Sequence, residues 1–108
     1  MIIKGDLMSQ VKIHPNWYYT IGKKTQAGIV QLTSVNLSVF KGKKLEILLA
    51  FGDIQQVSKE LGKKDPVVKI VDTKNQEIML KPLLVGSNDL EPLVDQLITA
   101  IESARGNV

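Results

Sequence analysis

Short apolar stretches separated by turn-forming residues fill the region from Gly28 to Val57. Each stretch is four or five residues long and rich in leucine and β-branched residues, which favours strands over helices. We expect these strands at Ile29–Thr33, Leu37–Phe40, Leu45–Leu49 and Ile54–Val57. The turns between them are Ser34–Asn36, Lys41–Lys44 and Phe51–Asp53. Such short connections predict a curved antiparallel sheet.

Further strands are predicted on either side of this region. The first lies in Val11–Ile21, where apolar alternation is interrupted at His14-Pro15-Asn16. The second half, Trp17–Ile21, is rich in aromatic and β-branched residues and is predicted as the strand. Two more, Val67–Val71 and Gln76–Leu80, are expected to form a hairpin around residues 72–75 before Pro82 ends the run. Gly22–Gly28 and Lys59–Pro66 are expected to be loops. About seven short strands of this spacing are typical of a barrel or sandwich.

The apolar period changes near the C-terminal end of the chain. Apolar residues then recur at helical spacing: Leu90, Leu93, Val94, Leu97, Ile98, Ile101 and Ala104. Asn88 and Glu91 form a capping-box pattern, Pro92 falls in the first turn, and Arg105 and Gly106 are suited to the end of a helix. We predict a helix over 89–105. Its stripe is wider than a partner-binding seam, which favours packing against the sheet.

Composition narrows the function classes. The chain has 108 residues, enough for one domain, and no Cys, which excludes disulfides, thiolate nucleophiles and Cys-ligated metals. The longest apolar run, Ile47–Phe51, is too short to cross a bilayer, and the N-terminal segment lacks the long apolar run of a secretory signal. We therefore expect a cytoplasmic protein.

The net charge of +3 is unevenly distributed. Residues 88–105 carry four acidic residues and one Arg, whereas the rest of the chain carries 13 Lys and seven acidic residues. Arg105 is the sole Arg of the chain. Because Arg provides the bidentate contacts to guanine and phosphate, its scarcity argues against sequence-specific nucleic-acid binding.

Three segments resemble the pleckstrin-homology-like (PH-like) superfold, in its GRAM and bacterial PH-like branches. Gly28–Thr33 resembles a G-x-L-x-L-T strand, Leu37–Phe40 an L-x-x-F strand, and Leu49–Val57 an I-P-x-x-[DE]-I-x-x-V segment. Ala50 takes the place of the frequent Pro, and no Arg or Lys precedes the L-x-x-F strand. The resemblance covers about residues 28–105. It implies a seven-stranded antiparallel barrel or orthogonal sandwich capped by the helix, as one domain over 1–108. The resemblance does not explain residues 1–13, which we interpret as an added edge strand.

Lysines are placed at three predicted turns. They are Lys23 and Lys24, then Lys41, Lys43 and Lys44, then Lys74. The resemblance implies that these turns surround a phosphoinositide head-group in the lipid-binding members of the superfold. Several ammonium groups on one rim would attract phosphate by their positive potential. The alternative is that these lysines only keep the hairpins soluble.

Other candidate residues point to structural roles. Alternation puts Trp17 and Tyr19 on one face of their strand and Tyr18 on the other, so we expect a core face and a rim face instead of a base-stacking platform. His14 is the single histidine and has no companion His or Cys for a metal. No nucleophile, base and acid occur at a catalytic spacing. We predict a protein without a cofactor, a metal or an enzymatic activity.

The leading hypothesis is a non-enzymatic PH-like interaction module that binds a protein or peptide, or a second copy of itself. Strand addition at an exposed sheet edge near residues 1–13 would provide the assembly surface. An anionic membrane surface or phosphate ligand at the Lys turns is the alternative, and would place the protein at the membrane periphery. A nucleic-acid-binding small barrel is the third candidate, suggested by a pI near 9.2.

Overall fold

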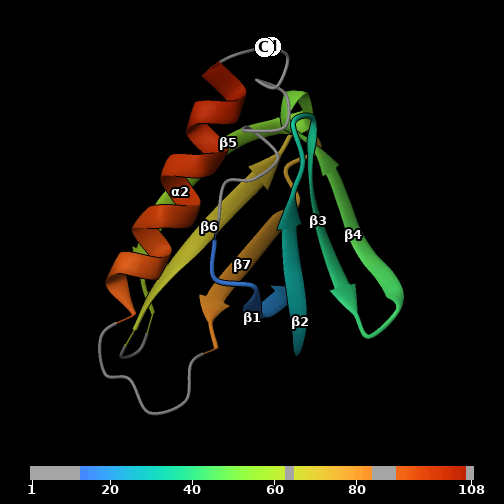
Figure 1. Cartoon of the computed structure of the whole chain (residues 1–108), viewed down its shortest axis with the longest axis vertical. Coiled ribbons are helices and arrows are strands. Elements are labelled where there is room, and N and C mark those ends of the chain that lie inside the picture. Colours follow the sequence, from blue (N-terminus) through green and yellow to red (C-terminus); the bar gives the residue numbers. More distant parts are fainter. Residues whose placement is uncertain (1–12, 63–64, 84–89, 107–108) are drawn as a thin grey trace, which may run out of the picture.

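Buried and exposed side chains alternate along the strands, as expected for a sheet with one face on a core. The computed structural model describes residues 13–62, 65–83 and 90–106. Its strands are β1 (Asn16–Ile21), β2 (Lys24–Leu32), β3 (Asn36–Lys41), β4 (Lys44–Ala50), β5 (Ile54–Leu61), β6 (Pro66–Asp72) and β7 (Glu77–Pro82). A short 3₁₀ turn, η1 (Phe51–Asp53), joins β4 to β5, and one helix, α2 (Glu91–Gly106), follows the sheet (Figure 1).

The seven strands form one antiparallel sheet in the order β4-β3-β2-β1-β7-β6-β5. β1 therefore lies at its centre. The sheet curls into a half-barrel, and no pairing between its two end strands, β4 and β5, is present in the described part of the chain. The predicted fold class, a curled antiparallel sheet with a single C-terminal helix, is confirmed.

The concave face of the sheet and one face of α2 share a single core. Trp17 and Tyr19 of β1 are buried there, whereas Tyr18 is 39% exposed, so the predicted alternation is confirmed. The helix contributes the buried residues Val94, Leu97 and Ile101, and packs on β5, β6, β7 and η1. Each of these side chains stabilises the fold by about 1.5–3 kcal/mol on burial. The predicted apolar stripe therefore does pack against the sheet.

The helix also holds the outer end of the sheet at β5. The Lys59 ammonium donates to the carboxylates of Glu91 (2.7 Å) and Asp95 (3.0 Å). Near the other end of α2, Arg105 donates to the carbonyl of Gln55 (3.3 Å). Figure 1 shows α2 beside β5 and β6, with the β3–β4 hairpin on the opposite side of the molecule. The two end strands of the sheet are therefore unequal: β5 is bound to the helix and β4 is not.

Two predicted loops are shorter than expected. The loop predicted at Gly22–Gly28 is wrong, because β2 begins at Lys24 and pairs with β1 from there onward. Gly22 adopts a φ of +62°, so Gly22 and Lys23 alone form the tight turn that connects β1 to β2. The loop predicted at Lys59–Pro66 is also too long, because β5 continues to Leu61 and pairs with β6. The polar side chains of this part of β5 mark a solvated face of an end strand.

The ends of the predicted elements differ in smaller ways. The strand predicted after the His14-Pro15-Asn16 break is β1, which begins at Asn16, and Ile13 lies outside any strand. Gly106 is the last residue of α2 instead of its stop signal. The capping pattern at Asn88 and the rest of the predicted edge strand over 1–13 lie outside the described residues. β1 has neighbours on both sides, so an added strand could not pair with it.

Candidate functional site

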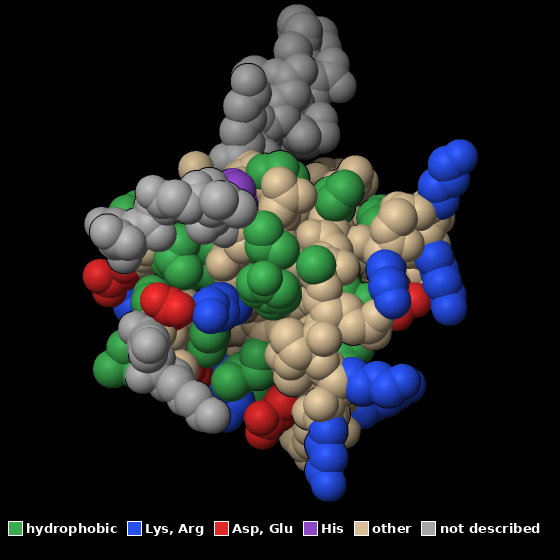
Figure 2. Space-filling view, turned by 90° about the horizontal axis from the view of Figure 1, so that it is seen from below, with side chains coloured by type: hydrophobic (Ala, Val, Ile, Leu, Met, Phe, Trp, Pro, Cys, Tyr) green, Lys and Arg blue, Asp and Glu red, His purple; other side chains and the backbone are tan. Residues whose placement is uncertain are grey.

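Five of the six predicted lysines lie on two hairpins at the same end of the sheet. Lys23 occupies the β1–β2 turn, and Lys43 occupies the β3–β4 turn beside Gly42, which has a φ of +62°. Lys24, Lys41 and Lys44 are strand residues next to these turns, not turn residues as predicted. Figure 2, which views the molecule from below, shows basic side chains gathered along one side of this end. We call these five residues the hairpin lysines.

The hairpin lysines differ in their partners. Lys44 lies 3.4 Å from a carboxylate oxygen of Glu46, and the Lys41 ammonium donates to the side-chain carbonyl of Gln26. Lys23, Lys24 and Lys43 have no ion pair or hydrogen-bonded side-chain partner within residues 13–62, 65–83 and 90–106. These three exposed ammonium groups are therefore available to an external anion.

Lys74 takes a different position from the hairpin lysines. It lies in the β6–β7 turn, where the Asp72 carboxylate accepts hydrogen bonds from the backbone amides of Lys74 (2.8 Å) and Gln76 (2.9 Å). Asn75 completes this turn with a φ of 65°. Lys74 and Gln76 line a pocket that includes none of the hairpin lysines. The pairing of Ile21 with Ile78 puts this turn at the same end of the sheet as the β1–β2 turn, so Lys74 differs from the hairpin lysines in the pocket it lines and not in the end of the sheet.

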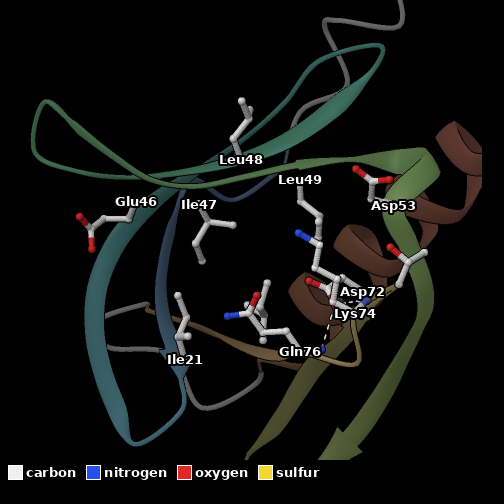
Figure 3. A pocket seen from close by; sticks show the side chains of 11 residues that line it. Ile21, Glu46, Ile47, Leu48, Leu49, Asp53, Asp72, Lys74 and Gln76 are labelled. Carbon is white, nitrogen blue, oxygen red and sulfur yellow. Dashed lines mark hydrogen bonds between the residues drawn. The ribbon is translucent and has the colours of Figure 1, made fainter.

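The pocket lined by Lys74 is a groove of about 360 Å³ along the unpaired edge of β4. One bank is formed by four consecutive residues of β4, Glu46–Leu49, and the other by η1 and the β6–β7 turn. Side chains of consecutive strand residues point to opposite faces, so all four can line one groove only along the edge of the strand. Figure 3 shows Lys74 and Gln76 reaching from their turn into the space beside β4. We call this pocket the edge groove.

The backbone of β4 presents hydrogen-bonding groups to the edge groove. The Phe51 amide donates to the Val35 carbonyl (3.0 Å), which fixes the alternation of bonded and non-bonded pairs between β3 and β4. In this alternation Leu37 with Leu49 is a bonded pair, so the neighbouring residues Leu48 and Ala50 direct their N–H and C=O groups away from β3. Leu48 therefore offers a main-chain donor and acceptor on the open side. Ala50 offers its N–H there, while its carbonyl lies at the N-cap of η1, where it accepts the first hydrogen bond of that turn.

A row of apolar side chains crosses the convex face of the sheet and ends at the same strand. Its members, which we call the outer row, are Tyr18, Ile29, Phe40, Leu45 and Leu48. Ile29 lies opposite Phe40, and Phe40 lies opposite Leu45. Tyr18 and Leu48 extend the row diagonally onto β1 and along β4. Leu45 and Leu48 are 44% and 59% exposed, so β4 carries apolar surface on both sides of its open edge.

Neither the outer row nor the edge groove follows from the sequence patterns that predicted the strands. One signal was present: Ile47-Leu48-Leu49 is apolar throughout, whereas a strand with one solvated face has a polar residue at every second position. A register shift between Val39 and Phe40 enlarges the outer row, because it turns Leu45 to the same face of the sheet as Leu48.

Glu46 lines the edge groove and also accepts a hydrogen bond from Tyr19, a buried residue of β1. The Tyr19 hydroxyl donates to a carboxylate oxygen of Glu46 at 3.3 Å, and Lys44 lies on the other oxygen. Burial raises the pKa of Tyr19 above its ordinary value of 10.0, and the Glu46 charge raises it further. The phenol therefore stays protonated and continues to donate to Glu46 at neutral pH.

His14 makes structural contacts. Its Nε2 lies 2.7 Å from the Leu83 carbonyl, its ring centroid is 6.4 Å from that of Trp17, and its carbonyl accepts from the Trp17 indole N–H. Across the described residues there is no group of three or more His, Asp or Glu side chains that could hold a metal ion. No helix of the described chain is long and apolar enough to cross a membrane.

No protein-family model matches this chain, and a search of curated proteins finds no match to it.

Proposed function

We propose that this protein is a non-enzymatic interaction module of the PH-like kind, acting in the cytoplasm, and that it binds a protein or peptide, with a second copy of itself among the candidates. The order of elements, seven strands followed by one helix, agrees with the resemblance to that superfold. The observation that carries the proposal is the exposed outer row, which ends at the one end strand, β4, that α2 does not hold. An exposed apolar edge strand is a template for pairing with another chain.

Association through apolar side chains resists salt, because the Debye length shortens to about 3 Å at 1 M without weakening apolar burial. The test combines sedimentation velocity over a range of protein concentrations with selection from a displayed random-peptide library, both at about 0.1 M and about 1 M salt. We expect self-association or peptide enrichment at both salt concentrations. A protein that stays monomeric and enriches no peptide would contradict the proposal.

A matched pair of variants locates the binding surface. Leu48→Glu places a charge on the outer row, whereas Leu61→Glu makes the same change at a residue of β5 that is 86% exposed. We expect Leu48→Glu to abolish the association and Leu61→Glu to leave it unchanged. If both variants associate to the same extent, the association does not depend on the outer row.

The hairpin lysines support a second candidate function, the binding of an anionic membrane surface. Its specific observation is three lysines on adjacent hairpins that have no ion pair with any residue the structure describes: Lys23, Lys24 and Lys43. Each basic residue near an anionic bilayer contributes about 1 kcal/mol, so binding would be weak and sensitive to salt. It would bring the protein to the periphery of the membrane.

Co-sedimentation with phosphatidylserine vesicles tests this second candidate. We expect binding at low salt that is lost at about 1 M salt and after reversal of Lys23, Lys24 and Lys43 to Glu. The control reverses Lys69 and Lys81, which pair with Glu77 and Asp65 on the other half of the sheet. If both sets of reversals leave vesicle binding unchanged, the hairpin lysines are not the binding site.

A further inference from the structure

We infer that the edge groove takes an extended peptide, added as a strand to β4, that carries apolar and basic residues in alternation. This inference rests on the proposed function and adds the binding position and the chemistry of the ligand. Three properties of the groove support it: the main-chain groups of β4, the opposite bank, and the charge.

The main chain of β4 provides the first contact. The pairing of β3 with β4 directs the N–H and C=O groups of Leu48 and the N–H of Ala50 to the open side. An antiparallel peptide can bond to both residues in the manner of an eighth strand. These bonds depend on the peptide backbone, so they give affinity without selecting a sequence.

The opposite bank provides partners for the far edge of the same peptide. An added strand leaves its own second edge unpaired, and that edge would face the β6–β7 turn. Gln76 can both donate to and accept from a peptide backbone, and the Lys74 ammonium can donate to a carbonyl. The two hydrogen bonds of the Asp72 carboxylate fix the turn that presents both side chains. The groove is therefore built on two sides, unlike a bare sheet edge.

The walls and charge of the groove select the peptide side chains. Ile21, Ile47, Leu49 and Ile78 form an apolar floor that suits every second side chain of an extended peptide. Three carboxylates line the groove with the Lys74 ammonium: Glu46 is paired with Lys44, Asp72 accepts two backbone hydrogen bonds, and Asp53 is left for a ligand. Asp53 is exposed, its side chain has no partner among the described residues, and it can pair with a basic side chain. A basic peptide is favoured even though the whole chain carries a net charge of +3.

The test measures binding of a blocked peptide of alternating lysine and valine, equal in length to the seven residues of β4. The comparison peptides are the same sequence N-methylated at every backbone nitrogen, which has no main-chain donor on either edge, and a glutamate–valine version. We expect isothermal titration to show one site for the lysine–valine peptide and affinities lower by about tenfold or more for the other two.

Two variants direct the test to the groove. Ala50→Pro removes one edge donor at a residue whose φ of −65° already suits proline, so the fold is retained. Asp53→Lys reverses a groove charge, and Glu60→Lys makes the same change at the far end of β5 as its control. We expect Ala50→Pro and Asp53→Lys to weaken the lysine–valine peptide and Glu60→Lys to have no effect.

The outcomes separate this inference from the proposed function. Suppose that the protein enriches library peptides, but the lysine–valine peptide binds equally well after N-methylation and to the Ala50→Pro variant. The peptide then binds elsewhere, so the inference about the edge groove is wrong while the proposed interaction module is retained. If the protein dimerises through β4 and excludes the peptide, the occupant is a second copy and the peptide is overturned. If nothing associates, both fail.

Discussion

The ring of Tyr19 lies over Gly28 of the neighbouring strand so closely that a Cβ on Gly28 would be 2.8 Å from the ring carbon Cε1. The same Cβ would lie 2.8 Å from the backbone carbonyl oxygen of Phe40, which cannot rotate away. Gly28 is thus a packing position inside β2 that lets Tyr19 lie flat in the core.

Gly28→Ala is therefore expected to destabilise the protein by about 1–3 kcal/mol, the usual effect of overpacking a core. Gly52→Ala is the matched control, because a Cβ there would meet nothing within 4 Å and the φ of Gly52 is not positive. We expect the control to change the free energy of unfolding by less than about 0.5 kcal/mol. Urea denaturation of the two variants measures both values, and equal midpoints would contradict the packing of Tyr19 on Gly28.

Tyr19 also makes the stability depend on alkaline pH. Its folded pKa is raised above 10.0 by burial and then by Glu46, so between pH 10 and the folded pKa the folded state keeps a proton that the unfolded state loses. The stabilisation is complete below pH 10 and is lost as the pH rises through the folded pKa. The free energy of unfolding should fall in this range.

Tyr19→Phe isolates this contribution. The pKa of Lys59 is also raised, by its hydrogen bonds to Glu91 and then Asp95, and its effect has the same sign, but it is present in both proteins and cancels in the comparison. Denaturation series on both sides of pH 10 should give a shallower fall for Tyr19→Phe than for the parent. Identical slopes would show that the Tyr19 phenol does not titrate differently on unfolding.

The helix is predicted to be part of the core and not an appendage. Leu97→Ala removes a fully buried side chain of α2 and should cost about 2–5 kcal/mol. Thr99→Ala, on the exposed face of the same helix, should cost less than about 0.5 kcal/mol. Thermal unfolding followed by the emission of buried Trp17 measures both. Loss of helical circular dichroism before the Trp17 transition would contradict a shared core.

The β6–β7 turn depends on the Asp72 carboxylate. Asp72→Ala removes the acceptor for the amides of Lys74 and Gln76 and should destabilise the protein by about 1–3 kcal/mol, whereas Asp72→Asn retains an acceptor oxygen and should cost less. Denaturant midpoints of the two variants provide the comparison. If Asp72→Ala and Asp72→Asn are equally stable, the two hydrogen bonds contribute nothing to the turn.

The sequence predicted those features of the fold that depend on the spacing of apolar residues within one strand or helix. The burial of Trp17 and Tyr19 with Tyr18 outside follows from strand alternation, and the packing of Leu97 and Ile101 follows from helical spacing. The loop at Gly22–Gly28 was wrong because Gly28 was taken as a turn residue. Its reason for being glycine is the ring of Tyr19, a contact between strands that spacing does not reveal.

The candidate site was less predictable, because it depends on which strands end up side by side. The β3–β4 turn that carries Lys43 was located correctly, whereas Lys23 lies in a turn much shorter than the predicted loop, and the role of both as an anion site remains a prediction. Lys74 was grouped with them because the resemblance implies that the three turns surround one ligand. In space, Lys74 lines the edge groove with residues of β4. The groove exists only because the curled sheet brings the β6–β7 turn to the open edge of β4, and no local pattern records that juxtaposition.

Amide hydrogen exchange along β4 tests the central claim most directly. The open edge predicts fast exchange for the amides of Leu48 and Ala50 in the free protein, and slow exchange for the amide of Leu49, which bonds to β3. Adding the lysine–valine peptide should protect Leu48 and Ala50 selectively. Strong protection of these two amides in dilute protein without any peptide would contradict an edge that is open to a partner.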